Sequence, residues 1–248
     1  MKKIALFVEG QTEQIFIERL IREMCGNERV SIISKRTQGG TNAPKQELVR
    51  NASFARRADI QVLIYDCGAD NRVKSEIIEN IPNLTESGYT CIVGLRDLYP
   101  LSVDELPRLE AGLRFLPPSI YKKYKNPFDV IVIVQEIETW FLAETHHLQR
   151  VDRRLTGHFI DKKLGFNPYS MNAVHRKHPA KDLNDIYQLV GRSYTKKYWQ
   201  VHRLVNRLDF DHLLRHIRYN VDSLDELVTI IERFKAGLYP FFRGSKKK

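Results

Sequence analysis

Residues 3–13 of the chain read KIALFVEGQTE, an apolar strand that runs into a Glu-Gly turn and then into a helix beginning with a second glutamate. The pattern places Glu9 at the carboxyl end of a buried strand and Glu13 in the first turn of the helix that follows. In open α/β sheets, ligands and metals bind at this edge, where side chains from several strand ends meet. A carboxylate there can bind a hard cation, although an isolated Glu-Gly favours a solvated residue or an ion pair with an arginine.

Four short apolar runs, rich in valine and isoleucine and without alternation, predict strands that are buried on both faces of a mainly parallel sheet. They are Ile4–Val8, Ile60–Tyr65, Cys91–Leu95 and Val130–Val134. A further β-like piece lies at 30–34, and helical patterns separate the strands, including the segments 45–57 and 101–116. The predicted fold class is therefore α/β, with the sheet flanked by helices.

The chain changes character after about residue 148, where helical periodicity replaces the buried strands and basic residues are interleaved with aromatics and histidines. We interpret 1–147 as an α/β domain and 148–248 as a basic helical subdomain. The basic clusters can bind phosphates and the aromatics can stack on unpaired bases, although an ordinary basic surface is the alternative. The residues expected to contact nucleic acid are Arg96, Arg176, Lys177, Lys196 and Lys197.

The 248 residues carry 40 basic and 30 acidic side chains, a formal charge of +10 that suits a polyanionic partner. The hydrophobic content of 42% excludes a disordered or fibrous chain. No apolar run approaches a membrane span and the first residues lack a signal-peptide core, so we expect a cytoplasmic protein that does not bind membranes. Cys25, Cys67 and Cys91 lack metal-ligand spacing, which favours reduced, buried thiols.

Acidic residues follow two later strands, at what would be the same edge of the sheet as Glu9. Asp97 follows the third apolar run, and Glu136 and Glu138 follow the fourth, directly before the aromatic and apolar segment 139–143. A carboxylate this close to a core needs a paired arginine, several backbone donors or a metal. Arg96 is one available partner that is not a metal.

The metal that these acids suggest is Mg2+ or Mn2+, because oxygen atoms are the ligands that hard cations prefer. Zinc would require histidine or cysteine, and the eight histidines form only loose groups, such as His146 with His147 and His175 with His178. We interpret those histidines as surface or phosphate-facing residues. The predicted metal ligands, for which a structural cluster of ion pairs is the alternative, are Glu9, Glu13, Asp97, Glu136 and Glu138.

Three stretches of the sequence resemble the domain of unknown function 4276 family, a group with a Toprim-like fold. They are Phe7-Val8-Glu9-Gly10-Gln11-Thr12-Glu13, Leu95-Arg96-Asp97-Leu98 and the segment 136–143, EIETWFLA. The resemblance extends over nearly the whole chain. Toprim folds occur in topoisomerases, primases and OLD-family nucleases, and related small Toprim proteins accompany ATPase subunits in bacterial phage-defence systems such as PARIS. The resemblance therefore implies nucleic acid, RNA or DNA, as the substrate and the ATPase of a defence system as a partner.

In that group, a glutamate after the first strand and an Asp-x-Asp after a later strand organise divalent metal for phosphodiester chemistry. By resemblance, Glu9 takes the first role and Asp97 opens the second, but Tyr99 stands where the second aspartate would be. Acids elsewhere in the chain can replace the missing carboxylate, namely Glu136, Glu138, or Asp66 with Asp70. The other interpretation is that the site has lost its activity.

Two functions from different classes follow from these observations. The first is a metal-dependent nuclease that a partner ATPase releases, with Glu9, Asp97 and Glu136 as catalytic residues. Glu9 is also placed to act as the general base. The second is a non-catalytic subunit, in which the same acids are structural and the basic half binds nucleic acid or an acidic partner. Either protein can form oligomers, and no G-x-G-x-x-G or P-loop pattern supports nucleotide binding at the switch point of the sheet.

Overall fold

The computed structural model of the chain describes residues 1–39, 44–69, 71–124 and 128–239. The strands among these residues are β1 (Lys2–Val8), β2 (Val30–Gln38), β3 (Gln46–Ser53), β4 (Ile60–Asp66), β5 (Cys91–Asp97) and β6 (Asp129–Ile133). The helices are α1 (Gln11–Cys25), α2 (Val73–Glu86), α3 (Leu106–Arg114), α4 (Pro118–Tyr124), α5 (Glu138–Ala143), α6 (His146–Val151), α7 (Gly157–Leu164), α8 (Pro179–Gln188), α9 (Tyr198–Val205), α10 (Phe210–Arg215) and α11 (Asp222–Ala236). Short 3-10 turns lie at Val103–Glu105, Ala173–His175 and Ile217–Asn220.

The six strands form one sheet in the order β3-β2-β4-β1-β5-β6, and every neighbouring pair is parallel except β2 with β3. β1 lies inside the sheet, where Val8 pairs with Asp66 of β4 and Phe7 pairs with Gly94 of β5. Parallel neighbours require crossover connections, so the parallel strands all run in one direction and end at the same edge of the sheet. The predicted α/β class with a mainly parallel sheet is therefore confirmed, and the ends of β1, β4, β5 and β6 meet at one edge.

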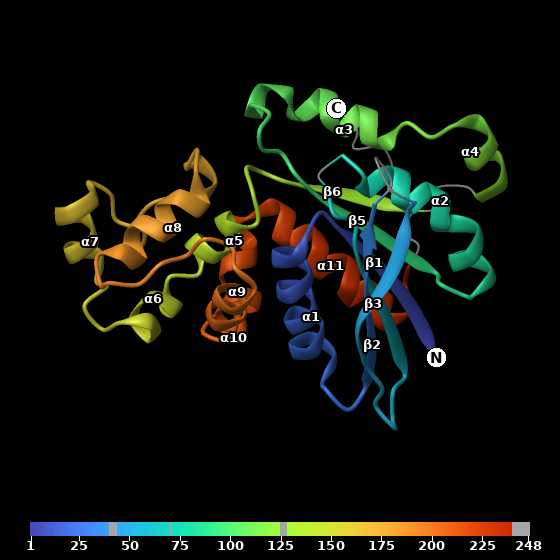
Figure 1. The fold of residues 1–248 in the computed structure, drawn as a ribbon, viewed down its shortest axis with the longest axis horizontal. Helices are drawn as coiled ribbons and strands as arrows, with labels where there is room; N and C mark the ends of the chain where they lie inside the picture. The colour runs from blue at the N-terminus through green and yellow to red at the C-terminus, as the bar shows by residue number, and fades with distance from the viewer. Residues whose placement is uncertain (40–43, 70, 125–127, 240–248) are drawn as a thin grey trace.

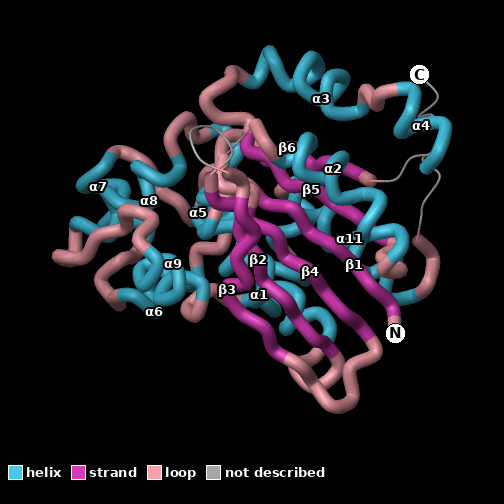
Figure 2. The backbone as a smooth tube through the Cα atoms, turned by 45° about the vertical axis from the view of Figure 1, so that its right-hand side comes forward, coloured by secondary structure: helices cyan, strands magenta, loops and turns pink. Residues whose placement is uncertain are grey.

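Both faces of β1 are buried, which explains why its apolar residues do not alternate with polar ones. Leu6 and Val8 belong to the same core cluster as the apolar residues of α1 and α11, whereas Phe7 packs with Val73 and Ile77 of α2. Figures 1 and 2 show α1 and α11 on one face of the sheet and α2 on the other. Each such buried side chain contributes about 1.5–3 kcal/mol, so the two helical layers hold the central strand firmly.

The helices from α5 to α10 gather beside the sheet and share its larger core (Figure 1). The Phe16 ring of α1 contacts Trp140 of α5 and Phe210 of α10, with ring centroids 5.5 and 5.7 Å apart. α11 then returns to pack next to β6. One hydrophobic cluster thus includes residues from both sides of the boundary expected between 147 and 148, and the division into two domains stays a prediction.

The helix predicted over 45–57 is wrong, because this segment contains β3, which pairs antiparallel with β2 at the edge of the sheet. Almost all of its side chains are exposed, so no buried face gives its sequence an alternating pattern. The helix expected over 101–116 is shorter than predicted. A single 3-10 turn covers 103–105, and α3 covers only 106–114.

The three cysteines are free and buried, as predicted. Burial raises the pKa of the Cys67 and Cys91 thiols, which makes them poor nucleophiles. Among the described residues, no helix combines the length and the apolar character that crossing a bilayer requires.

Gly94 shows how tightly β5 packs against α2. An added Cβ at this position would lie 2.8 Å from Val73 Cγ1 and 2.9 Å from Ile77 Cδ1. We expect Gly94→Ala to lower the free energy of unfolding by about 1–3 kcal/mol, because both neighbours belong to a packed core. Gly112→Ala is the control: its Cβ would meet open space in α3, where alanine stabilises a helix by up to ~1 kcal/mol. Urea unfolding measures both variants, and equal effects would contradict the close packing.

Candidate functional site

Glu9 and Asp97 meet at the carboxyl ends of β1 and β5. Glu9 directly follows β1 and is almost fully buried, and its Oε1 accepts a hydrogen bond of 3.0 Å from the backbone N–H of Asp97. The two residues are distant in sequence and meet because β1 and β5 are parallel neighbours. The structure thus brings together the first two residues of the predicted site.

Glu13 is buried in the first turn of α1. Burial is the largest cause that raises the pKa of Glu13 from 4.5 to about 7, and the negative charge of Glu138 raises it further. Backbone hydrogen bonds at Glu13 and Gly10 and the positive charge of Lys196 lower the pKa but do not compensate. Near neutral pH, a large fraction of Glu13 is therefore protonated unless a cation is supplied.

Glu136 and Glu138 share one cation, the ammonium group of Lys196. Lys196 Nζ lies 2.9 Å from Glu136 Oε2 and 2.9 Å from Glu138 Oε2. The other oxygen of Glu138 accepts a hydrogen bond of 2.6 Å from the Tyr194 hydroxyl, and the other oxygen of Glu136 accepts one of 2.8 Å from the N–H of Ala180. Burial nevertheless outweighs these partners of Glu138 and raises its pKa.

Asp97 also has a strongly raised pKa. Burial is the first cause that raises its pKa well above 3.8, followed by the charges of Glu13, Glu9 and Glu138. Its Oδ1 is buried and has no hydrogen-bond partner in the described part of the chain. We call Glu9, Glu13, Asp97 and Glu138 the acidic cluster, because their charges act on one another in a buried place. Among the described residues, Lys196 is the cation whose charge lowers the pKa of Glu13, Asp97 and Glu138, and it does not offset the causes that raise these pKa values.

Lys196 has a different environment from the one we expected. The sequence suggested a side chain that contacts nucleic acid, whereas the structure places the ammonium group between two acids. Burial lowers the pKa of Lys196, but the charges of Glu138 and Glu136 outweigh it and raise the pKa above its usual value. No local pattern in the sequence indicates this contact, because it depends on how the segment between α8 and α9 folds back onto α5.

The other residues expected to contact nucleic acid have surroundings that differ from one residue to the next. Lys177 and Lys197 are exposed. Arg176 is bound to Asp182, with its Nε 2.6 Å from Oδ2. Arg96 lies next to Asp97, and its buried Nε has no hydrogen-bond partner among the described residues. The role of these four side chains in nucleic-acid binding stays a prediction.

The other acids offered as replacements for the missing aspartate differ in their environments. Asp66 is buried at the end of β4, accepts a hydrogen bond from the N–H of Gly68 and pairs with Arg36 at 3.4 Å. Asp70 lies outside the described residues. Tyr99, at the position of the missing aspartate, is 48% exposed. Glu138 is therefore the acid best placed to complete the cluster.

A second group of titratable side chains surrounds Glu144, which is fully buried just before α6. Its Oε1 accepts a hydrogen bond of 2.9 Å from the N–H of His146, and its Oε2 accepts bonds of 3.2 Å from the N–H groups of His147 and Asp209. Burial raises the pKa of Glu144, but the hydrogen bonds from His147, Asp209 and His212 outweigh it and hold the pKa below its usual value. Glu144 is therefore ionised at neutral pH.

This Glu144 group can hold a metal ion, because ligand atoms of Glu144, His146 and His212 all lie within 4.8 Å of one another. The rings of His146 and His212 stack with centroids 3.7 Å apart and planes at 7°, so one ring must turn before both nitrogens face the same ion. No local pattern in the sequence indicates this group, because His212 belongs to a distant helix, α10. The expectation that His147 lies at the surface is wrong, since it is fully buried.

The sequence also matches a known family. The family described as "Domain of unknown function (DUF4276)" matches residues 8–216, most of the chain. The chain belongs to the DUF4276 family. The matched span includes the whole acidic cluster and Lys196, and it confirms the family that the three sequence stretches resemble. The Toprim-like relationship stays a prediction.

No curated protein matches the chain. Among solved structures, one described as "the putative cell surface hydrolase from Lactobacillus plantarum WCFS1" has 13% sequence identity and a TM-score of 0.31, and the match covers 92% of this chain and 96% of that one. A similarity at this level supports no conclusion about function.

The raised pKa of Glu13 predicts how stability changes with pH in the absence of metal. The folded protein holds this proton up to about pH 7, whereas the unfolded chain releases it near 4.5, so the Glu13 contribution to stability is lost as pH rises through this window. Glu13→Gln removes the loss. We expect its free energy of unfolding, relative to the parent, to rise between pH 5 and pH 8 by up to about 3 kcal/mol in EDTA.

The control for this experiment is Glu23→Gln on the same helix, where the carboxylate is exposed and pairs with Arg19 at 2.6 Å. Urea unfolding at several pH values measures both variants. A difference between Glu13→Gln and the parent that does not change with pH would show that Glu13 is not buried among acids.

Proposed function

We propose that the chain is a divalent-metal-dependent phosphodiesterase that hydrolyses RNA or DNA at the carboxyl edge of its sheet. The observation that carries the proposal is the charge of the acidic cluster. Burial and mutual repulsion raise the pKa values of Glu13, Asp97 and Glu138, and Lys196 alone does not balance them. Buried carboxylates at this density, at the end of parallel strands, are typical of sites that bind cations.

The side chains have the donor chemistry for a hard cation such as Mg2+ or Mn2+. Among the described residues, only Glu144, His146 and His212 already have their ligand atoms within 4.8 Å of one another, so the acids must move closer together to share an ion. Asp97 Oδ1 is buried without a hydrogen-bond partner in the described part of the chain, so one oxygen ligand is available. Glu9, Glu13 and Asp97 would hold the ion, with Glu138 beside them, and every donor in this set is a carboxylate oxygen. When bound, the ion would activate a water molecule and neutralise the scissile phosphate.

Other side chains of the proposed site orient the acids, attract the substrate phosphate or accept a proton. The Tyr194 hydroxyl and the Lys196 ammonium fix Glu138 from two sides. Lys196 stays charged, so it can attract a phosphate oxygen next to the acids. Glu9 is the proposed general base, although its Oε1 accepts the N–H of Asp97. Glu136 has both oxygens occupied, by Lys196 and by the N–H of Ala180, and its catalytic role stays a prediction.

The proposed substrate and biological setting have two supports. The formal charge of +10 favours a polyanion. The resemblance to Toprim proteins suggests the effector nuclease of a bacterial anti-phage module, held inactive by a partner ATPase until infection.

The alternative is a non-catalytic subunit that binds nucleic acid or an ATPase through a degenerate Toprim site. Two observations favour it: Tyr99 replaces an aspartate and is half exposed, and Lys196 occupies an oxygen on each of Glu136 and Glu138. In such a protein, protons and Lys196 together would balance the buried acids. Metal binding distinguishes the two functions.

We expect Mn2+ to raise the melting temperature of the protein, because an ion that binds only the folded state stabilises it, by roughly 2.7 kcal/mol at about 100 times its Kd. The increment should be largely lost in Asp97→Asn. It should persist in His212→Ala, which removes a ligand of the Glu144 group. The reverse pattern would place the ion at the Glu144 group, and the absence of any increment would favour the non-catalytic subunit.

The direct test of hydrolysis is incubation of the protein with mixed tRNA, plasmid and single-stranded DNA in Mn2+ or Mg2+. We expect cleavage of one of these substrates, reduced about a hundredfold or more in Glu9→Gln and in Asp97→Asn, because both acids would hold the ion. Glu23→Gln, an exposed acid on α1, should cleave like the parent. Metal binding without cleavage would indicate that an activating partner is required.

A further inference from the structure

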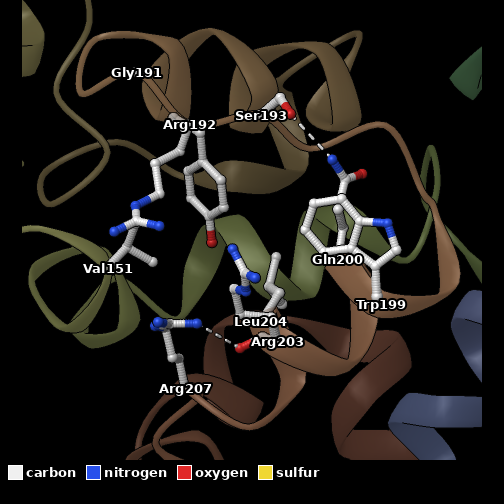
Figure 3. Close-up of a pocket in the computed structure, with 10 residues that line it drawn as sticks. Val151, Gly191, Arg192, Ser193, Trp199, Gln200, Arg203, Leu204 and Arg207 are labelled. Carbon is white, nitrogen blue, oxygen red and sulfur yellow. Dashed lines mark hydrogen bonds between the residues drawn. The ribbon is translucent and has the colours of Figure 1, made fainter.

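A cavity of about 170 Å3 lies in the helical half, between the end of α8 and α9 (Figure 3). The side chains on its wall that matter here are Tyr187, Arg192, Trp199, Gln200, Arg203 and Arg207. Figure 3 shows the Arg192 and Arg207 side chains on one side of the cavity and the Trp199 indole on the other. Guanidinium groups around an exposed aromatic ring are the combination by which proteins bind the phosphate and the base of a nucleotide.

The three arginines give the cavity a positive charge that no acid on its wall balances. Within the described part of the chain, none of Arg192, Arg203 and Arg207 forms an ion pair with a carboxylate. The Arg207 guanidinium instead donates to backbone carbonyl oxygens at 3.1 and 3.3 Å, which orient it without neutralising it. Asp152 interacts with the charge of Arg192, but Arg154 already binds both of its oxygens at 2.9 Å. The cavity therefore attracts an anion.

Two aromatic side chains add a hydrogen-bond donor and a stacking surface. The Tyr187 hydroxyl is buried and has no hydrogen-bond partner among the described residues. Burial raises its pKa, so the hydroxyl keeps its proton and can donate to a phosphate oxygen. Trp199 is 52% exposed, and the Arg203 guanidinium lies 4.9 Å from its ring centroid. The cation–π contact holds the indole in place while half of it stays open to a ligand.

The cavity and the acidic cluster share one loop. Ser193 and Gln200 line the cavity, and Gln200 of α9 holds the loop between α8 and α9: its Oε1 accepts the N–H of Thr195 at 2.7 Å and its Nε2 donates to Ser193 Oγ at 3.0 Å. Tyr194 and Lys196, from the same loop, bind the acids at the sheet edge. A ligand in the cavity therefore contacts the segment that supplies the cation of the acidic cluster.

We propose that this cavity binds one nucleotide unit, with its phosphate on Arg192, Arg203 and Arg207 and its base on Trp199. The ligand is a free nucleoside monophosphate or a nucleotide within a strand, since both present the same phosphate and base. The relevance of the site to hydrolysis rests on the proposed function, because a strand held here lies against the loop that carries Lys196. Binding itself requires no hydrolysis.

The test measures binding with EDTA present, so that cleavage plays no part. The ligands are adenosine monophosphate, adenosine, inorganic phosphate and a 5′-phosphorylated oligoadenylate. Calorimetry and the quenching of tryptophan fluorescence measure the binding of each. Quenching reports on Trp199 because Trp140 is fully buried. We expect the monophosphate or the oligonucleotide to bind about tenfold or more tightly than adenosine or phosphate, since only they engage both halves of the site.

Two variants test the two halves separately. Arg192→Gln and Trp199→Ala should each weaken binding about tenfold or more, and both side chains are exposed, so the fold is retained. The matched control is Arg215→Gln, an exposed arginine of the same half that pairs with Asp211 at 2.6 Å. It should bind like the parent. Circular dichroism verifies that each variant is folded.

The outcomes separate the sources of the ligand and the two proposals. Binding of the monophosphate supports a free nucleotide, whereas binding of the oligonucleotide alone, with the same dependence on both variants, supports a strand. Failure of both ligands to bind, or binding that neither variant weakens, overturns the proposal. Phosphate that binds as tightly as the monophosphate overturns the stacking of a base on Trp199. A protein that binds nucleotides here but neither gains stability from Mn2+ nor cleaves nucleic acid refutes the nuclease alone.

Discussion

The burial of several carboxylates beside Lys196, at the carboxyl edge of the sheet, is the constraint on which the rest of the site depends. An unpaired carboxylate in a protein interior costs several kcal/mol, and a whole domain is stable by only about 5–15 kcal/mol. Glu13 and Glu138 are buried in such an interior by α1 and α5, and the half-buried Asp97 of β5 lies beside Glu9 with its Oδ1 inaccessible to solvent. The fold tolerates them because backbone N–H groups, the Tyr194 hydroxyl and Lys196 offset part of the cost and because protons offset another part.

The helical half supplies side chains that offset the charge of the buried acids, in addition to covering the sheet. Lys196 and Tyr194 both come from the segment between α8 and α9, so the cation and one donor of the acidic cluster depend on how that segment folds. The backbone is strained where it does so. Lys196 has φ of 56° and Gln135, directly before Glu136, has φ of 65°, and each non-glycine residue in this conformation costs about 1 kcal/mol or more. Lys196 and the neighbour of Glu136 are thus both strained, at the two sides of the Lys196–Glu136 ion pair. Backbone strain of this kind clusters at functional sites.

The sequence predicts the strands that carry the acids of the site better than it predicts the side chains that bind those acids. Short apolar runs mark the buried parallel strands, and parallel strands end at one edge. The pattern alone therefore predicts that Glu9 and Asp97 lie at the same edge of the sheet. The contact of Lys196 with the acids and that of His212 with Glu144 depend on loops and helices that pack from far along the chain, which no local pattern records. β3 was missed for another reason: an exposed edge strand has no buried face, and its composition resembles that of a polar helix.

On the two proposals, the opposite charges of the acidic cluster and the arginine cavity impose an order on binding. Without a cation, the acidic cluster repels a phosphate, because Lys196 is already shared between Glu136 and Glu138. The arginine cavity has the opposite charge and attracts phosphate under the same conditions. On the two proposals, a strand would be bound first through the cavity, and the acids would accept a phosphate of the same strand only once their own charge is neutralised. If both proposals hold, metal-free protein should bind nucleic acid without cutting it, because the arginine cavity attracts phosphate while the acids repel it.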